Sequence, residues 1–126
     1  PPASARAAIV PLPVTPGDPR LAHKTSDRTF YDAARRASGM DEVIFERSDG
    51  RLTEGSFTNL FVERDGVLLT PPAADGLLPG VLRRHLLETG RAREASISRA
   101  DLEGGFLLGN ALRGLFRAAL VAPAGE

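Results

Sequence analysis

The sequence predicts an α+β domain that is rich in short strands and contains two main helices. Short apolar runs bounded by glycine, proline, aspartate or serine recur along the chain and are typical of strands. Two longer stretches space their apolar side chains at helical intervals. With 126 residues, of which 42% are hydrophobic, the chain is long enough to bury one core.

Each element follows from this pattern. The first helix is expected to begin after a cap at Ser26 or Asp27 and to run to about Ala37, with Gly39 ending it. The second is expected over 81–89, ended by Gly90. Asp65-Gly66 predicts a hairpin turn, and Ser98 predicts the cap of a short helical turn at 100–102. The predicted strands are 7–10, 42–46, 51–54, 59–63, 67–70, 95–97, 106–108 and 115–122.

The N-terminal stretch differs in composition from the rest. Six of the ten prolines lie in residues 1–20, which are therefore expected to form a proline-rich leading or linker segment before the domain at 21–126. The chain begins with Pro1-Pro2 and has no initiator methionine, so we expect it to be a piece of a longer polypeptide.

Composition excludes several classes of function. Sixteen basic and sixteen acidic residues give a net charge of zero, which argues against nucleic-acid binding. No apolar run approaches the ~20 residues that span a membrane. No signal peptide is visible, which favours the cytoplasm. The chain has no cysteine, so disulfides and thiolate metal ligands are excluded, and no metal site is predicted.

Lys24 is the only lysine beside fifteen arginines. Arginine stays protonated and cannot serve as an amine nucleophile, whereas a lysine can lose its proton and attack a carbonyl group. The sequence therefore indicates a chemical role for Lys24, although a chance surface position is an equally good explanation of composition alone.

Four segments carry the other candidate residues: 23–28, 52–61, 76–83 and 107–115. Gly80 opens a helix whose first backbone N–H groups could bind an anion. Glu54 lies at a strand end before small polar residues, and Asn110 lies between Gly109 and Ala111, where it could simply stabilise a turn. Each signal is weak alone.

Together, the lysine, the T-E-G-S-F-T-N-L-F segment, the L-P-G-V-L-R segment and the G-N-A-L-R-G segment resemble the fold-type IV enzymes that depend on pyridoxal 5′-phosphate (PLP). That group includes branched-chain and D-amino-acid aminotransferases and 4-amino-4-deoxychorismate lyases. The nearest resemblance is to the lyase domain fused to para-aminobenzoate synthase component I. It implies the large C-terminal domain of that fold and a lyase that releases pyruvate to give para-aminobenzoate for folate synthesis.

The resemblance also implies the roles of individual residues. Lys24 would form the Schiff base with PLP and then act as acid and base. Glu54 would face the pyridine nitrogen and keep it protonated. Arg28 would lie near the phenolic oxygen of the cofactor.

The cofactor phosphate would be held by two other segments. Gly80, Val81 and Leu82 would bind it at the helix start, where Val81 and Leu82 replace the Ile-Thr pair of the aminotransferases and leave the contact to backbone amides. Asn110 and Ala111 would contribute from the neighbouring strand end.

The resemblance implies a small-molecule amine as substrate, a homodimer, and a smaller N-terminal domain of the same polypeptide that this chain does not contain. Without that domain the fragment could be inactive. Two alternatives stay open: a D-amino-acid or branched-chain aminotransferase, and a non-catalytic domain that keeps the fold.

Overall fold

The computed structural model describes residues 4–15, 17–18 and 29–121. Eight strands and two α-helices are found in these residues, together with the short 3-10 helices Ala73–Asp75 and Arg99–Leu102. In chain order the elements are β1 (Ala5–Pro11), α1 (Thr29–Ser38), β2 (Glu42–Glu46), β3 (Leu52–Gly55), β4 (Asn59–Arg64), β5 (Val67–Thr70), α2 (Val81–Glu88), β6 (Ala92–Glu94), β7 (Phe106–Asn110) and β8 (Gly114–Leu120).

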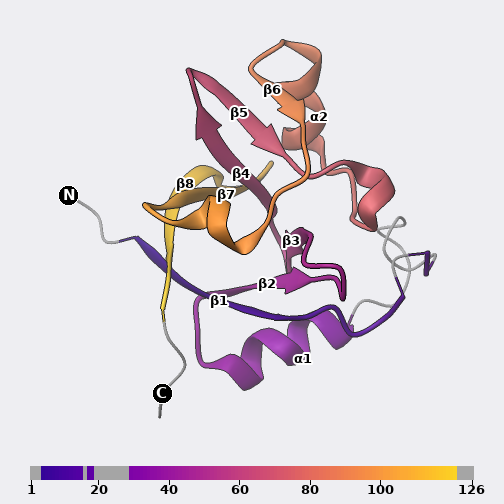
Figure 1. Cartoon of the computed structure of the whole chain (residues 1–126). Coiled ribbons are helices and arrows are strands. Elements are labelled where there is room, and N and C mark those ends of the chain that lie inside the picture. The colour runs from indigo at the N-terminus through magenta and orange to yellow at the C-terminus, as the bar shows by residue number, and fades with distance from the viewer. Residues whose placement is uncertain (1–3, 16, 19–28, 122–126) are drawn as a thin grey trace.

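The strands form a small closed barrel with an extension. Their order is β3-β2-β1-β8-β7-β4, and an additional pairing between β3 and β4 closes the ring. Beyond β4, the strands β5 and β6 continue the sheet away from the barrel (Figure 1). The predicted strand-rich α+β fold with two helices is confirmed.

Strand β1 lies inside the proline-rich leading segment and is central to the barrel. It runs parallel to both neighbours, with Ala7 opposite Glu42 and Ala5 opposite Ala118. The side chain of Ala7 is fully buried. Residues Ala5–Pro11 are therefore part of the folded domain rather than a connection to it.

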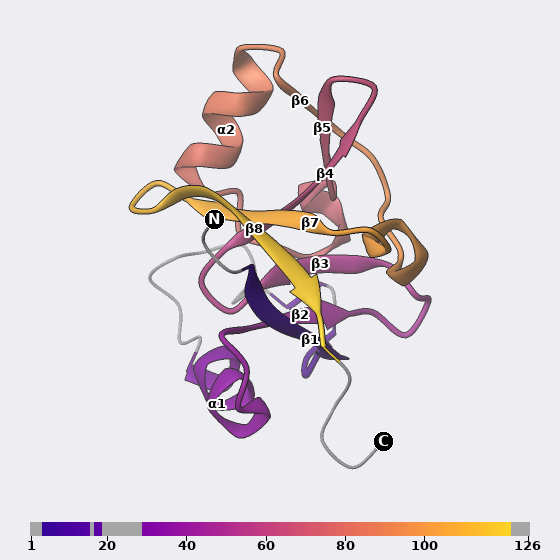
Figure 2. The same cartoon turned by 90° about the vertical axis from the view of Figure 1, so that its left-hand side faces the viewer.

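The two helices cover different sides of the barrel (Figure 2). On α1, Tyr31 is fully buried and stacks on Phe45 of β2 with a ring-centroid distance of 3.9 Å. On α2, Leu86 packs with Phe61 of β4, and Leu82 is partly buried against the same cluster. No described helix has the length and apolar character needed to cross a membrane.

The strand predicted at 95–97 is wrong in position, because the structure places β6 at Ala92–Glu94. The backbone N–H of Ala95 still bonds to Thr70, but the chain then turns, and the carbonyl of Ile97 accepts from Leu52 at 2.8 Å. Ile97 is apolar because it fills the core, not because it extends the strand.

The predicted turns are present. Asp65 and Gly66 both have positive φ angles, 53° and 81°, as a tight hairpin requires. The predicted cap at Ser98 begins a 3-10 turn in which the Ser98 N–H donates to the Asp101 carboxylate at 2.8 Å. That bond is the main reason why the pKa of Asp101 lies below its usual value. The predicted caps Ser26 and Asp27 lie outside the described residues.

Strand register gathers the candidate residues at one end of the barrel. Glu54 of β3 pairs with Asn59 of β4, Asn59 pairs with Gly109 of β7, and Asn110 pairs with Gly114 of β8. Segments 52–61 and 107–115, far apart in the sequence, therefore meet at this end.

Candidate functional site

Glu54 occupies a buried position at the end of β3. Its side chain is 3% exposed, and both carboxylate oxygens accept from the backbone N–H of Leu78, at 3.3 and 3.2 Å. The pairing with Asn59 aims Glu54 toward the segment that leads into α2. A buried carboxylate bonded to a loop amide is positioned firmly and can hold a proton on a basic group.

The peptide groups of Leu78 tie the second and third candidate segments together. Glu54 accepts from its N–H, and the side-chain amide of Asn59 donates to its carbonyl at 3.0 Å. Because Pro79 and Gly80 follow directly, these contacts fix where α2 begins.

The N-terminus of α2 has the form of an anion site. Gly80 is its N-cap and provides no side-chain cap. Among the described residues, no acceptor bonds to the amides of Val81 or Leu82. Val81 is 65% exposed, while Leu82 packs inward against Leu86 and Phe61. Free first-turn amides and the positive end of the helix dipole favour a negative charge here.

Gly80 is required for a reason that the sequence does not reveal. A Cβ atom at this position would stand 2.6 Å from the side-chain oxygen of Asn59, which is closer than real contacts allow. Since Asn59 also bonds to Leu78, the glycine lets the loop and the helix start approach β4 closely.

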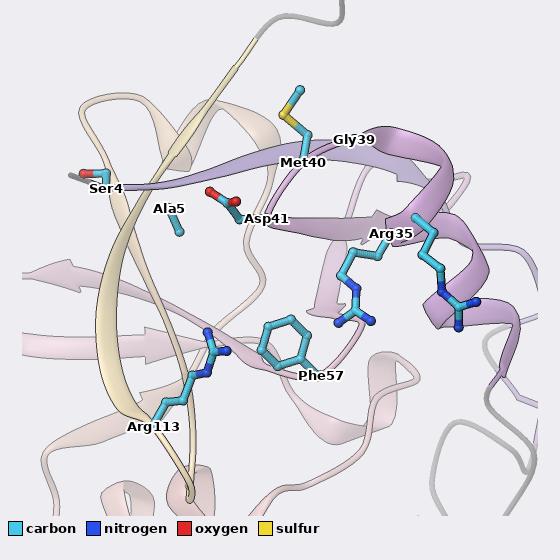
Figure 3. Close-up of a pocket in the computed structure, with 9 residues that line it drawn as sticks. Ser4, Ala5, Arg35, Gly39, Met40, Asp41, Phe57 and Arg113 are labelled. Carbon is cyan, nitrogen blue, oxygen red and sulfur yellow. The ribbon is translucent and has the colours of Figure 1, made fainter. Parts of the chain in front are cut away.

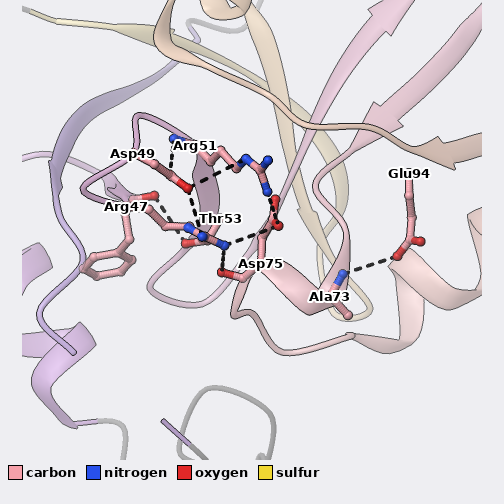
Figure 4. A network of polar contacts seen from close by, with 8 residues as sticks. Arg47, Asp49, Arg51, Thr53, Ala73, Asp75 and Glu94 are labelled. Carbon is pink, nitrogen blue, oxygen red and sulfur yellow. Dashed lines mark hydrogen bonds and ion pairs between the residues drawn. The ribbon is translucent and has the colours of Figure 1, made fainter. Parts of the chain in front are cut away.

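An ionic cluster around the buried Asp75 anchors the loop that leads to α2 (Figure 4). The carboxylate of Asp75, whose side chain is 6% exposed, accepts from Arg51 at 3.1 Å and from Arg47 at 3.3 Å. Further along, Glu94 accepts from Arg83 of α2 and from the backbone of Ala73. These bonds hold both the loop and α2 against the sheet, which limits movement of the helix start.

Asn110 uses its side chain within the protein. Its oxygen accepts from the backbone N–H of Arg113 at 2.8 Å, and its nitrogen donates to the carbonyl of Phe57 at 3.0 Å. The side chain of Asn110 therefore stabilises the β7–β8 turn. A ligand at this turn would be contacted by backbone groups. Ala111 is exposed in the same turn.

Glu42 is a functional candidate that sequence reasoning missed. Its carboxylate is 1% exposed and accepts from the backbone of Ser56 at 2.9 Å and of Phe57 at 3.2 Å, and from the hydroxyls of Ser56 and Thr58. It thereby fixes the loop that follows Glu54. In the sequence Glu42 is only an acidic residue at the start of a predicted strand, which does not distinguish it from a solvated glutamate.

The described site thus brings together Glu54, the start of α2 and the β7–β8 turn. The last two are in contact, since a Cβ atom on Gly109 would lie 2.9 Å from the side chain of Leu82. The predicted Lys24 and Arg28 lie outside the described residues.

Comparison with known proteins identifies the family of the chain. The family described as "Amino-transferase class IV" matches residues 1–121. A crystal structure of a candidate amino-acid aminotransferase from Mesorhizobium loti is 41% identical with a TM-score of 0.85, over 94% of this chain and 60% of that one. A candidate aminodeoxychorismate lyase from Schizosaccharomyces pombe is 28% identical over 85% of this chain and 51% of its own length.

A third relative is the branched-chain-amino-acid aminotransferase of Escherichia coli K12, which is 36% identical over 53% of this chain and 23% of its own length. The chain thus spans about half the length of the S. pombe relative and less of the E. coli enzyme.

Proposed function

Because the chain belongs to the class IV aminotransferase family, whose members depend on PLP, we propose that it is the cofactor-holding part of a 4-amino-4-deoxychorismate lyase. The observation that carries the cofactor assignment is the buried carboxylate of Glu54 beside the loop that opens α2. Two features that PLP needs, a proton-holding group for its ring nitrogen and an anion site for its phosphate, are thereby adjacent.

The residues present fit this cofactor. The amides of Val81 and Leu82 would bind the phosphate, with Gly80 providing the close approach of the helix start. Backbone groups of Asn110 and Ala111 would add contacts from the neighbouring turn. Lys24, the only lysine, would bond to the cofactor covalently, and Arg28 would lie near its phenolic oxygen.

When bound, PLP supplies an electron-accepting ring for bond cleavage next to an amine. The chain itself contributes three actions. Glu54 keeps a proton on the ring nitrogen, and its burial keeps water from competing for that proton. Lys24 moves a proton to and from the amine-bearing carbon of the substrate. The α2 amides fix the cofactor while these transfers occur.

The lyase assignment draws on the G-N-A-L-R-G turn and on the S. pombe relative, which aligns over most of this chain. An amino-acid aminotransferase is the second candidate, favoured by the higher identity of the M. loti protein. Product analysis separates the two. A lyase converts aminodeoxychorismate to pyruvate and para-aminobenzoate, whereas an aminotransferase produces a keto acid from an amino donor.

The cofactor assignment has its own test. In the natural full-length protein, after incubation with PLP and reduction with borohydride, peptide mapping should find the pyridoxyl group on Lys24, and turnover of the variants is measured in the same protein. Glu54→Gln should retain PLP but lower turnover at least tenfold, because a neutral amide holds the ring proton poorly. Glu63→Gln, at an exposed position on β4, is the matched control. Label on the N-terminal amine alone, or full turnover of the Glu54 variant, would refute the assignment.

The remaining expectations concern the assembly. We propose that the active enzyme is a homodimer, that an N-terminal domain of the same polypeptide completes the site, and that component I of para-aminobenzoate synthase is fused to it. Light scattering of the natural full-length protein, and the sequence that precedes Pro1 in it, test these statements directly.

A further inference from the structure

A cavity opens between α1, the β3–β4 loop and the β7–β8 turn (Figure 3). Its volume is about 690 Å³, which lies within the range of small-molecule sites. Its lining combines three cations, one carboxylate and two large apolar side chains: Arg35, Arg36, Arg113, Asp41, Phe57 and Met40.

Two arginines stand on the faces of one phenylalanine. The guanidinium carbons of Arg35 and Arg113 lie 5.0 and 5.3 Å from the ring centroid of Phe57. Figure 3 shows the two side chains reaching the ring from opposite directions. Such cation–π contacts hold a guanidinium in place without consuming its N–H donors.

The backbone that carries this ring is held on both sides of the residue. The backbone N–H of Phe57 donates to Glu42 at 3.2 Å, and its carbonyl accepts from Asn110 at 3.0 Å. The buried carboxylate of Glu42 therefore helps to place the aromatic side chain against which Arg113 packs. An arginine held in this way is more preorganised than a mobile surface arginine.

The charge balance of the cavity favours an anion. Asp41 is already occupied, since it accepts from the backbone N–H of Arg6 at 2.8 Å and lies 3.5 Å from that guanidinium. Arg35 has a partly exposed partner, Asp32, at 3.6 Å. Within the described part of the chain, no carboxylate forms an ion pair with Arg113.

Two lining residues of the cavity are bonded to Asn110 of the proposed cofactor site. Phe57 follows Glu54 by three residues, and Asn110 bonds to both Phe57 and Arg113. A ligand held by Arg113 therefore sits next to the turn that is expected to contact the cofactor. The apolar surface of Phe57 and Met40 beside the cations suits a carboxylate carried on a ring.

We propose that Arg113 binds a carboxylate of a ring-bearing substrate, and that Phe57, which contacts Arg35 on its other side, sets the position of Arg113. This inference rests on the proposed function, because it identifies the acidic group of the substrate of that same site. Guanidinium groups recognise a planar carboxylate by paired N–H donors, which an amide or an alcohol cannot replace.

The test measures binding of 4-aminobenzoate to the full chain by calorimetry, without added cofactor. Arg113→Met should weaken binding about tenfold, which is the effect of one lost charge-assisted contact, and Arg35→Met should weaken it less, because Arg35 acts only through the Phe57 ring. Arg93→Met removes an exposed arginine on β6 and should leave binding unchanged. Neutral 4-aminobenzamide should bind less tightly than the carboxylate.

Each result decides the proposal. It is overturned if 4-aminobenzoate does not bind at millimolar concentration, if the amide binds equally well, or if Arg93→Met has the same effect as Arg113→Met. Failure of the proposed function would be visible separately, as carboxylate binding that depends on Arg113 in a protein that takes up no PLP on Lys24.

Discussion

Replacing Glu42 with glutamine tests how the loop after β3 is held. The substitution keeps the size of the side chain but turns one acceptor oxygen into an NH₂ donor. If the amide nitrogen takes the position of Oε2, it faces the N–H of Phe57 and the hydroxyl of Thr58. The hydroxyl of Thr58 can rotate and accept a hydrogen bond from this NH₂ group, but the N–H of Phe57 loses the carboxylate oxygen that accepts from it.

The magnitude follows from these contacts. One buried N–H without an acceptor costs ~1–3 kcal/mol, and the bonds to the remaining oxygen lose the contribution of the negative charge. Together they should lower the free energy of unfolding by about 2–4 kcal/mol, a large share of the ~5–15 kcal/mol of a typical domain. For a chain of this size the melting temperature should fall by roughly 6–15 °C.

The assay is thermal and urea unfolding followed by circular dichroism, with Glu63→Gln as control because that glutamate is exposed. The same variant should weaken 4-aminobenzoate binding, since the displaced loop carries Phe57. If Glu42→Gln unfolds within ~0.5 kcal/mol of the parent, which is the range of ordinary surface changes, the carboxylate does not hold the loop and the reasoning fails.

Two further predictions concern the helix start and a distant turn. Gly80→Ala should lower PLP affinity about tenfold in a spectrophotometric titration, because the new Cβ displaces Asn59 and shifts α2. Gly17→Ala is the control, because a Cβ there meets nothing within 4 Å and should leave the affinity unchanged. Equal affinities of the two variants would contradict this prediction. Asp101→Asn should reduce stability at pH 7 by ~0.5–1 kcal/mol through the weakened bond from Ser98. Because the pKa of Asp101 is lowered in the fold, the carboxylate stabilises fully above its unfolded value of 3.8, and the difference between parent and variant should shrink as the pH falls below that value. A difference that is independent of pH in urea titrations would contradict the assignment.

The elements that sequence predicted well are those with local causes. Asp65-Gly66 specifies its hairpin because both residues tolerate positive φ angles, and Gly39 and Gly90 end their helices for the same reason. The strand at 95–97 was misplaced because Ile97 is buried by a long-range contact with Leu52, which produces the same apolar pattern as a strand.

The candidate site also contains residues that local sequence predicts and contacts that only the folded chain creates. The motif around Glu54 could be predicted, but its contact with Leu78 depends on two segments that meet only in the folded chain. Glu42 gave no recognisable signal, since a glutamate before a strand is usually solvated and its donors lie fourteen to sixteen residues away. The predicted roles of Lys24 and Arg28 stay predictions.

The barrel closes where β3 meets β4, at the single paired position of Glu54 and Asn59. The same two side chains hold Leu78 and hence the start of α2. The β3–β4 junction, called here the seam of the barrel, and the proposed cofactor site therefore share these two side chains and form one cooperative unit. A cofactor that binds only the closed seam suppresses its opening by RT ln(1 + [L]/Kd), where [L] is the free cofactor concentration. Amide protons at this seam should accordingly exchange more slowly when PLP is present, while those of the β4–β5 hairpin should not change.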